Sequence, residues 1–340
     1  MNEVLNILYQ SNDYYAVVTG VSLTSLLINN TDIDEINIFI LDDQISEKNK
    51  VKFEQICKQY ERTLVFVNTD IILNRLKELE VAPFKNTYTT YFKLFAINEL
   101  DLKTHRVLQL DGDTIIVGSL KELCYLDIDE YVCAATYDCT QNSYKSLINI
   151  PITDKYYNCG VLLINQHVWR EECCEEKIAH HLRCVRNRYY TVDQDIINVL
   201  FRKKICYLDI KYNFNSGFYI YGIQNSLRMY DLKPAYYNTV MEIEEAYENP
   251  VIYHCMGAMT GRPWELDSIH PQNDLFASYL GKSPWAAYQK QRVKRSNIFR
   301  IQRILYRLLP RQMYIPIHAR AQKHYLTNMD KAVRSLSENK

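Results

Sequence analysis

Short apolar runs alternate with longer stretches of helical periodicity along the chain. The runs keep apolar residues at successive positions, which is typical of strands that are buried on both faces of a sheet. They predict strands at 6–9, 36–41, 63–68, 105–110, 131–138, 156–165 and 251–257. The periodic stretches predict helices at 15–29, 46–60, 89–100, 167–190 and 191–201, the second of them opened by Ser46 as N-cap. This order predicts an α/β fold whose mostly parallel central sheet carries helices on both faces.

The stretch VLQLDGDTIIV, residues 107–117, sets Asp111 and Asp113 at the end of a predicted strand. An Asp-Gly pair between apolar runs is a strong signal for a β-hairpin, in which both acids would be turn residues. Alternatively a strand ends here, and the two carboxylates, which share a face because they lie two positions apart, bind one cation. Mostly parallel sheets carry their binding sites at the carboxyl ends of strands, which favours the second interpretation.

Other polar residues lie at the ends of predicted elements, namely Asn158, Asp193, Gln194 and His254. Three of them have a structural explanation as well: a turn for Asn158, the first helical turn for Asp193 and a satisfied core imidazole for His254. Two carboxylates and an imidazole without a thiolate suit a divalent ion of intermediate hardness such as Mn²⁺. Three protein ligands would leave coordination positions on the ion that diphosphate oxygens could fill.

Composition points to a soluble enzyme. The chain has 340 residues, of which 47% are hydrophobic and 24% are charged. The ten cysteines are scattered and form no C-x-x-C pair, so we expect reduced thiols in a cytosolic protein. The first residues lack the basic region and the cleavage pattern of a secretory signal, and the uncharged stretch 14–31 is too polar to span a membrane.

The net charge is zero, but it is unevenly distributed. Between Lys282 and Tyr325 there are 11 Lys and Arg residues and no Asp or Glu. We therefore expect a catalytic domain at 1–270 and a basic, amphipathic, helical C-terminal region at 271–340, whose partner is anionic.

Residues 298–309 form an amphipathic pattern when they are placed on a helix, which Pro310 would end. One side carries Ile298, Ile301, Ile304, Leu305, Leu308 and Leu309, the opposite side carries Arg300, Arg303 and Arg307, and Phe299 and Tyr306 lie at a boundary. The apolar side could dock on the catalytic domain. Binding of nucleic acid is disfavoured because it would leave that side unused. The excess of basic residues favours a helix that lies on an anionic membrane surface.

Four motifs occur in the order Leu110-Asp111-Gly112-Asp113, YYNCGVLLIN, DQDIIN and YHCMGAMTGRPW. In combination they resemble the retaining glycosyltransferases of family 8, the group with bacterial lipooligosaccharide galactosyltransferases and glycogenin. The resemblance spans about residues 5–265 and disfavours the hairpin. It implies a GT-A-type nucleotide-sugar-binding fold. The activity it implies is metal-dependent, retaining transfer of galactose or glucose from UDP-galactose or UDP-glucose to a hydroxyl of a glycan or lipid-linked saccharide acceptor, in the synthesis of cell-surface polysaccharide or lipopolysaccharide-type glycan.

The resemblance also implies roles for individual residues. The metal ligands are Asp111, Asp113 and His254, and the cofactor is Mn²⁺, with Mg²⁺ as the other choice. The implied nucleotide-binding residues are Tyr9, Ser11 and Asp13 for the uridine, and Lys93, Gly112, Gly257 and Arg262 around the diphosphate. Two of them depart from the family pattern. Lys93 stands where Arg is usual, and Arg262 follows the histidine by eight residues where the family has Lys after six.

Asn158, Asp193 and Gln194 match the family positions that line the donor sugar and the reacting carbon, and Asp138 falls near the acceptor site. No carboxylate is placed as a nucleophile, so the resemblance favours front-face transfer, with the amide oxygen of Gln194 beside the oxocarbenium-like centre. A glycosidase would need two carboxyl groups on either side of the scissile bond, whereas Asp111 and Asp113 are neighbours.

Two alternatives stay open: a non-catalytic protein that binds nucleotide-sugar or glycan, and a metal-dependent nucleotidyl- or phosphotransferase. We expect a cytoplasmic protein, peripherally associated with the inner face of the membrane. Loops 139–155 and 213–235 are expected to select the acceptor.

Overall fold

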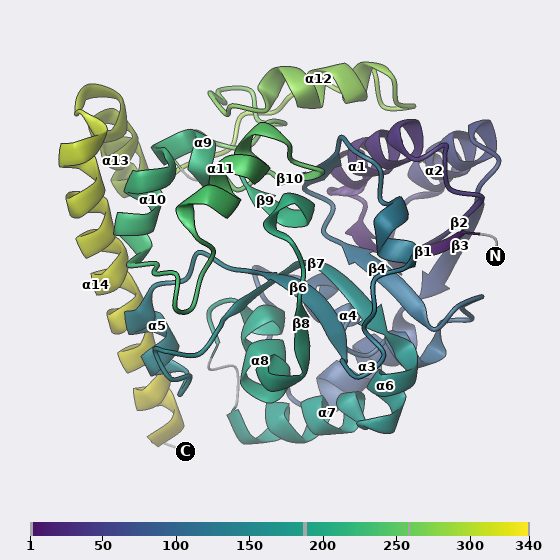
Figure 1. The fold of residues 1–340 in the computed structure, drawn as a ribbon, viewed down its shortest axis with the longest axis horizontal. Helices are drawn as coiled ribbons and strands as arrows, with labels where there is room; N and C mark the ends of the chain where they lie inside the picture. Colours follow the sequence, from purple (N-terminus) through teal and green to yellow (C-terminus); the bar gives the residue numbers. More distant parts are fainter. Residues whose placement is uncertain (1–2, 186–188, 258, 339–340) are drawn as a thin grey trace.

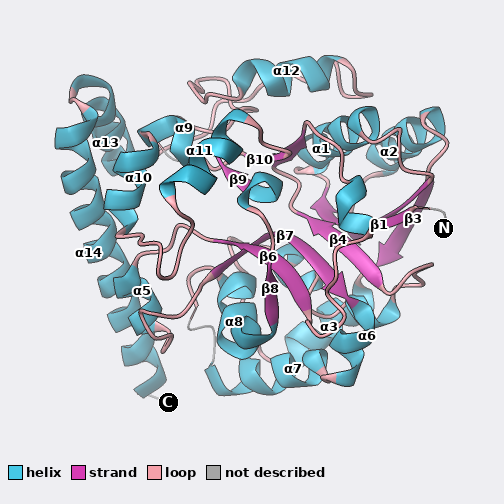
Figure 2. Ribbon diagram, viewed as in Figure 1, coloured by secondary structure: helices cyan, strands magenta, loops and turns pink. Residues whose placement is uncertain are grey.

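The computed structural model describes residues 3–185, 189–257 and 259–338, with a seven-stranded sheet at its centre (Figures 1 and 2). In spatial order its strands are β3 (Thr63–Asn68), β2 (Glu35–Asp43), β1 (Val4–Asn12), β4 (Arg106–Leu110), β7 (Tyr157–Asn165), β6 (Cys133–Tyr137) and β8 (Ile205–Tyr207). The pairs β2–β3, β1–β2, β1–β4 and β6–β8 are parallel, and β7 is antiparallel to both β4 and β6. The expected mostly parallel sheet is confirmed.

Helices cover both faces of this sheet, as predicted. One face carries α1 (Ala16–Asn29), α2 (Glu47–Gln59) and α12 (Asn273–Gly281); the other carries α3 (Asp70–Glu78), α4 (Thr89–Phe92), α6 (Gln166–Glu171), α7 (Cys174–Val185) and α8 (Val192–Phe201). In β1, Ile7 and Tyr9 join the core under α1, while Leu8 between them joins the opposite core. Both faces of the strand are therefore buried, which is why its apolar residues do not alternate with polar ones.

A second, three-stranded sheet consists of β5 (Thr114–Ile116), β10 (Ile252–His254) and β9 (Phe214–Asn215). The strand after the Asp-Gly pair is β5, and it pairs with β10 instead of β4, with Thr114 opposite His254. The hairpin alternative is therefore wrong. This pairing also brings His254 to the acids that end β4, because the Cys255 amide donates to the carbonyl of Asp113 at 2.9 Å.

Two expected helices differ from the structure. The stretch 89–100 is helical only over α4 and a short 3₁₀ turn, η1 (Ile97–Glu99), with turns between them. Residues 91–97 are all buried, so no side of this segment faces solvent. The stretch 167–190 contains two helices, α6 and α7, separated near Cys173, whose φ is 49°; its residues 186–188 lie outside the described residues. Ser46 occupies the N-cap position of α2, but its side chain makes no capping hydrogen bond. The helix α3 was not predicted.

Residues beyond 270 begin with α12, which packs on the same core as α1. Phe276 and Trp285 are buried there, Trp285 against Phe53 and Gly20, and the Trp285 indole donates to Asn49 at 2.8 Å. Smaller helices follow β6 and β9, namely α5 (Asn142–Leu147) after β6, and α9 (Gly217–Tyr221), α10 (Ile223–Tyr230) and α11 (Val240–Glu248) after β9.

The chain ends in two helices at one side of the molecule, α13 (Asn297–Leu308) and α14 (Arg311–Glu338), with α14 along α10 and α5 (Figure 1). Pro310 separates them, as predicted. Tyr306 is buried against the body of the protein and Phe299, Leu305 and Leu309 are partly buried, whereas the apolar side chains Ile298, Ile301, Ile304 and Leu308 are 55–76% exposed. The helix thus docks through one edge of its apolar stripe and presents the rest to solvent. Among the described residues, none of the helices has the length and apolar character needed to cross a bilayer.

Candidate active site

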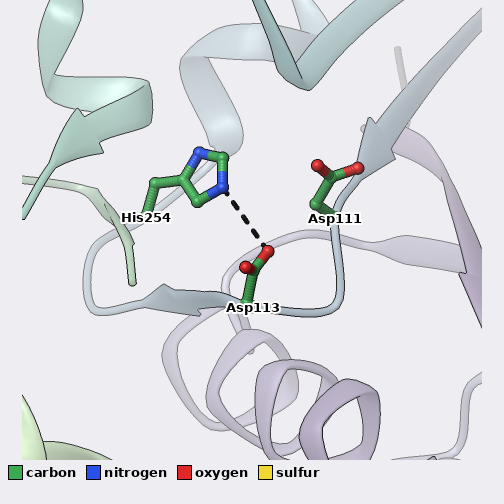
Figure 3. Close-up of side chains that lie close together, drawn as sticks. All are labelled: Asp111, Asp113 and His254. Atoms are coloured by element: carbon green, nitrogen blue, oxygen red, sulfur yellow. Dashed lines mark ion pairs between the residues drawn. The ribbon is translucent and has the colours of Figure 1, made fainter. Parts of the chain in front are cut away.

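The end of β4 and the end of β10 bring three potential metal ligands together. Asp111, Asp113 and His254 face one another (Figure 3), and one ligand atom from each lies within 4.8 Å of the others. The Nε2 atom of His254 is 3.4 Å from Oδ1 of Asp113. Two carboxylate oxygens and one imidazole nitrogen form a donor set that fits Mn²⁺ or Mg²⁺, and the fit is better for Mn²⁺ because nitrogen is a softer ligand.

The His254 ring is held in place from behind. Its Nδ1 atom lies 3.0 Å from Oδ1 of Asn213, the residue before β9, whose Nδ2 in turn donates to Asn158. Because Asn213 presents its oxygen to Nδ1, the neutral imidazole carries its proton there and turns the Nε2 lone pair toward the acids. Gly160 makes room for the ring, since a Cβ at that position would collide with Cε1 of His254.

Lys93 neutralises the charge beneath this cluster. Its ammonium group is buried, 2.7 Å from Oδ2 of Asp193 and 3.3 Å from Oδ1 of Asp111, and it donates to the Cys159 carbonyl at 2.7 Å. Burial opposes the charge, but the two carboxylates outweigh it and raise the pKa of Lys93 above its ordinary value. Burial raises the pKa of Asp193 to about 6, although Lys93 acts in the opposite direction. Lys93 therefore keeps two acids together that would otherwise repel each other.

Arg262 neutralises Asp113 from the opposite side. Its guanidinium group forms an ion pair with Oδ2 of Asp113, donates to the Tyr15 hydroxyl at 3.0 Å and lies over the Trp264 ring. Burial alone would raise the pKa of Asp113, but Arg262 and then His254 lower it well below its ordinary value, so this carboxylate stays ionised. Burial also lowers the pKa of His254, and Asp113 more than compensates, so the net pKa shift of the imidazole is upward.

A chain of hydrogen bonds continues from His254 to the residues expected around the donor and acceptor sugars. Beyond Asn213, the Asn158 amide donates to Oδ1 of Asp138 at 2.7 Å, and Gln194 donates to Oδ2 of Asp138 at 3.2 Å. The oxygen of Gln194 accepts from the Cys159 amide at 3.1 Å. The expected residues Asn158 and Gln194 thus both contact the expected acceptor residue Asp138 directly.

Of the residues expected around the uridine, Tyr9 and Ser11 lie near the end of β1 and are buried, and Asp13 lies in the loop that follows. The Tyr9 side chain belongs to the core and its hydroxyl is 2.9 Å from Ser22, while the Ser11 hydroxyl bonds to Thr19. Asp13 is exposed and accepts hydrogen bonds from the backbone amide of Ser46 and the side chain of Asn49. In this structure only the Asp13 side chain is open to a ligand from outside.

Gly112 and Gly257 have local structural roles. Gly112 is buried against Thr19 in the turn between the two acids. The space beside Gly257 holds the Arg262 side chain, since a Cβ there would come within 2.9 Å of it. The expected approach of a diphosphate to Gly257 therefore requires Arg262 to move or to share that space. Ala258, in the same loop, lies outside the described residues.

Four residues of the site were not identified from the sequence: Tyr15, Lys85, Gly160 and Asn213. Burial, and then the charge of nearby Arg262, lower the pKa of Lys85, while Asp113 acts in the opposite direction. A sequence signal existed only for Gly160, which follows Asn158 within one of the four motifs. Asn213 is positioned by the pairing of β9 with β10, which no local pattern reveals.

The sequence matches the family described as Glycosyl transferase family 8 over residues 6–267. A lipopolysaccharide 1,3-galactosyltransferase of Salmonella typhimurium is 30% identical over 289 residues, which cover 83% of this chain and 79% of the relative. A lipopolysaccharide 1,2-glucosyltransferase of Escherichia coli K12 is 28% identical over 291 residues, which cover 84% and 80%.

The fold is also that of a solved galactosyltransferase, LgtC, in complex with donor and acceptor sugar analogues. The two structures agree with a TM-score of 0.66 at 22% identity, over 87% of this chain and 99% of LgtC. The expected GT-A-type fold is therefore confirmed.

Proposed function

Because the chain belongs to glycosyl transferase family 8, we propose that it is a metal-dependent, retaining hexosyltransferase that moves galactose or glucose from a UDP-sugar to a hydroxyl group of a glycan or lipid-linked saccharide. The observation that carries this proposal is the Asp111–Asp113–His254 cluster, hydrogen-bonded through Asn213 and Asn158 to Asp138. Two relatives named as lipopolysaccharide glucosyl- and galactosyltransferases support the choice of hexose and a role in lipopolysaccharide-type or other cell-surface glycan synthesis.

A divalent metal held by these three residues would act as a Lewis acid toward the diphosphate leaving group. The protein's own part is to hold the ligands ready. Asn213 orients the imidazole, and Lys93 keeps Asp111 beside Asp193. Arg262 is the cation nearest to Asp113, and we propose that it turns from this carboxylate to the diphosphate when nucleotide binds.

We assign the donor sugar to the space near Asn158, Asp193 and Gln194, and the acceptor to the vicinity of Asp138. Both oxygens of Asp138 already accept hydrogen bonds, from Asn158, Gln194 and Thr140, which suits positioning better than nucleophilic attack. We therefore favour front-face transfer. The bond from the sugar carbon to the diphosphate oxygen breaks, the acceptor oxygen bonds to the same face of that carbon, and the acceptor proton passes to the diphosphate.

We further propose that the protein acts at the inner face of the membrane, held by α13. This helix turns Ile298, Ile301, Ile304 and Leu308 to solvent within a segment that carries basic residues and no acids from 282 to 325. Basic residues near an anionic lipid surface contribute about 1 kcal/mol each, and apolar side chains add to this by insertion.

The test is to incubate the protein with several UDP-sugars and Mn²⁺, with and without saccharide acceptors, and to follow UDP release. Asp113→Asn should abolish turnover, whereas the matched control Asp129→Asn, whose side chain is 77% exposed and remote from the cluster, should not. The anomeric configuration of the product, measured by NMR, should match that of the donor. Tight UDP binding without turnover would indicate a binding protein. Release of sugar phosphate would indicate nucleotidyl transfer, and release of UMP would indicate transfer of the sugar phosphate. An inverted product would refute the mechanism.

A further inference from the structure

A second cluster of charged residues lies where the loop 260–267, which carries Arg262, meets the start of α13. A cavity of about 230 Å³ opens there. It is lined by Glu265, Asp267, Arg292, Val293, Arg295, Phe299, Arg300 and Arg303. None of these residues belongs to the candidate active site, so this is a separate place on the molecule.

The charges around this cavity do not balance. Arg295 forms an ion pair with Glu265, and Nε of Arg292 lies 3.0 Å from Asp267. Among the described residues, no carboxylate forms an ion pair with either of the other two arginines, Arg300 and Arg303. Two of the four guanidinium groups therefore remain without a counter-ion.

Arg303 shows the imbalance most directly. Its Nη2 atom donates to the carbonyls of Thr260 and Asp267, but its Nε is buried and has no hydrogen-bond partner. A buried N–H without an acceptor is unfavourable, and such groups usually mark the position of a water or an ion. Burial, followed by the like charges of Arg307 and Arg295, lowers the pKa of Arg303, as expected where positive charge accumulates.

We propose that this cavity is a binding site for a phosphoryl group, with Arg300 and Arg303 as its principal ligands. A guanidinium group presents two parallel N–H donors to phosphate oxygens, and two guanidinium groups without carboxylate partners supply the charge that such an anion needs. The volume is several times that of a water molecule, about 30 Å³, and admits a phosphate together with its nearest waters.

The phosphoryl group can come from a lipid or from solution. Ile298 and Ile301, on the same helix as Arg300, are 70% and 58% exposed, so a phosphate in this cavity could belong to a lipid head group at a membrane surface. The same chemistry would also accept a free phosphate or diphosphate. The proposal goes beyond the sugar transfer and does not depend on it.

The test compares Arg300→Gln with Arg307→Gln in the full chain. Arg307 lies on the same helix, is exposed and does not line the cavity. Arg307→Gln therefore removes the same charge from the same helix without changing the cavity. Neither side chain has a carboxylate partner among the described residues, and both variants should fold. Each protein is titrated with inorganic phosphate in EDTA by calorimetry, and is sedimented with vesicles of phosphatidylcholine, with and without phosphatidic acid.

We expect Arg300→Gln to weaken phosphate binding roughly tenfold, the loss of one charge-assisted hydrogen-bonding group, and Arg307→Gln to leave it unchanged. Arg303→Gln should reproduce the effect of Arg300→Gln. If the protein binds only vesicles that contain phosphatidic acid, and Arg300→Gln weakens this vesicle binding more than Arg307→Gln does, the site binds a lipid phosphate. Equal weakening by both variants, or no binding in either arm, would overturn the site. The turnover of UDP-sugar in solution should be the same in all variants, so failure here is distinct from failure of the proposed activity.

Discussion

Replacing Lys93 with methionine tests the electrostatic arrangement beneath the metal cluster. The Lys93 ammonium is buried between Asp111 and Asp193, and methionine fills similar space without charge. The variant leaves buried Asp193 without its cation. Breaking a buried ion pair by removing one partner costs about 3–5 kcal/mol of unfolding free energy, and we expect a loss in this range at pH 8.

The deficit should depend on pH because Asp193 titrates near neutrality. Burial raises its pKa from 3.8 to about 6 in the folded protein. A carboxyl group whose pKa is raised by folding favours the folded state below its unfolded pKa, and this contribution is lost as the pH rises through the folded pKa. The wild-type protein therefore loses about 3 kcal/mol from Asp193 between pH 3 and pH 8. Without Lys93 the pKa of Asp193 rises further, so the variant loses more.

At pH 5 Asp193 is mostly protonated in both folded proteins. The unfolding free energy of Lys93→Met should then be only about 1–2 kcal/mol below that of the wild type, mainly because the hydrogen bond to the Cys159 carbonyl is lost. The assay is urea denaturation in EDTA at pH 5, 6.5 and 8. Lys103→Met is the matched control: Lys103 is 64% exposed and pairs with Glu35, so its loss should cost at most about 1 kcal/mol. An equal deficit for Lys93→Met at pH 5 and pH 8 would refute the coupling of the two residues.

Three further predictions concern packing, catalysis and metal binding. Trp285→Ala should lower the unfolding free energy by about 3–5 kcal/mol, because the ring is buried against Phe53 and Gly20; unchanged stability by urea denaturation would contradict a core that extends beyond residue 280. Gln194→Ala should lower kcat roughly 100-fold and leave the affinity for UDP with Mn²⁺ unchanged by calorimetry, whereas a change confined to KM would place Gln194 in ground-state binding. UDP at about 100 times its Kd should raise the unfolding free energy by about 2.7 kcal/mol when Mn²⁺ is present, and Asp113→Asn should abolish the gain; an equal gain in EDTA would contradict the metal site.

The strands were predictable because burial on both faces leaves a clear pattern, an uninterrupted apolar run such as residues 38–41. The expected helix at 89–100 was wrong for a related reason. Residues 91–97 are all buried, so their apolar character reflects burial in the core and carries no information about helical periodicity. A periodic pattern is most informative where one side of the helix faces water.

The Asp111–Asp113–His254 cluster was predictable in outline because the two acids lie two positions apart and His254 ends a recognisable strand. What lay beyond prediction depends on pairing between distant segments. The partner of β5 lies more than a hundred residues away, and Asn213 reaches His254 only through the register of β9 with β10. In α13 the periodicity identified the apolar stripe, but the helix packs on the protein through Tyr306, at the boundary of that stripe. An aromatic ring buries more apolar area than an isoleucine side chain does.

The hydrogen bonds from His254 to Asp138 all run in one direction. His254 donates to Asn213, Asn213 to Asn158, and Asn158 to the Asp138 carboxylate, which can only accept. An aspartate expected at the acceptor site, together with the Gly160 amide that donates to Oδ1 of Asn158 at 2.8 Å, thus sets which way the two amides are turned and which imidazole nitrogen faces Asp111 and Asp113. Redesign of the acceptor preference at position 138 is constrained accordingly. A substitute that accepts a hydrogen bond there preserves this arrangement, whereas a lysine or arginine would set a donor against the Asn158 amide, which the Gly160 amide holds in its present orientation.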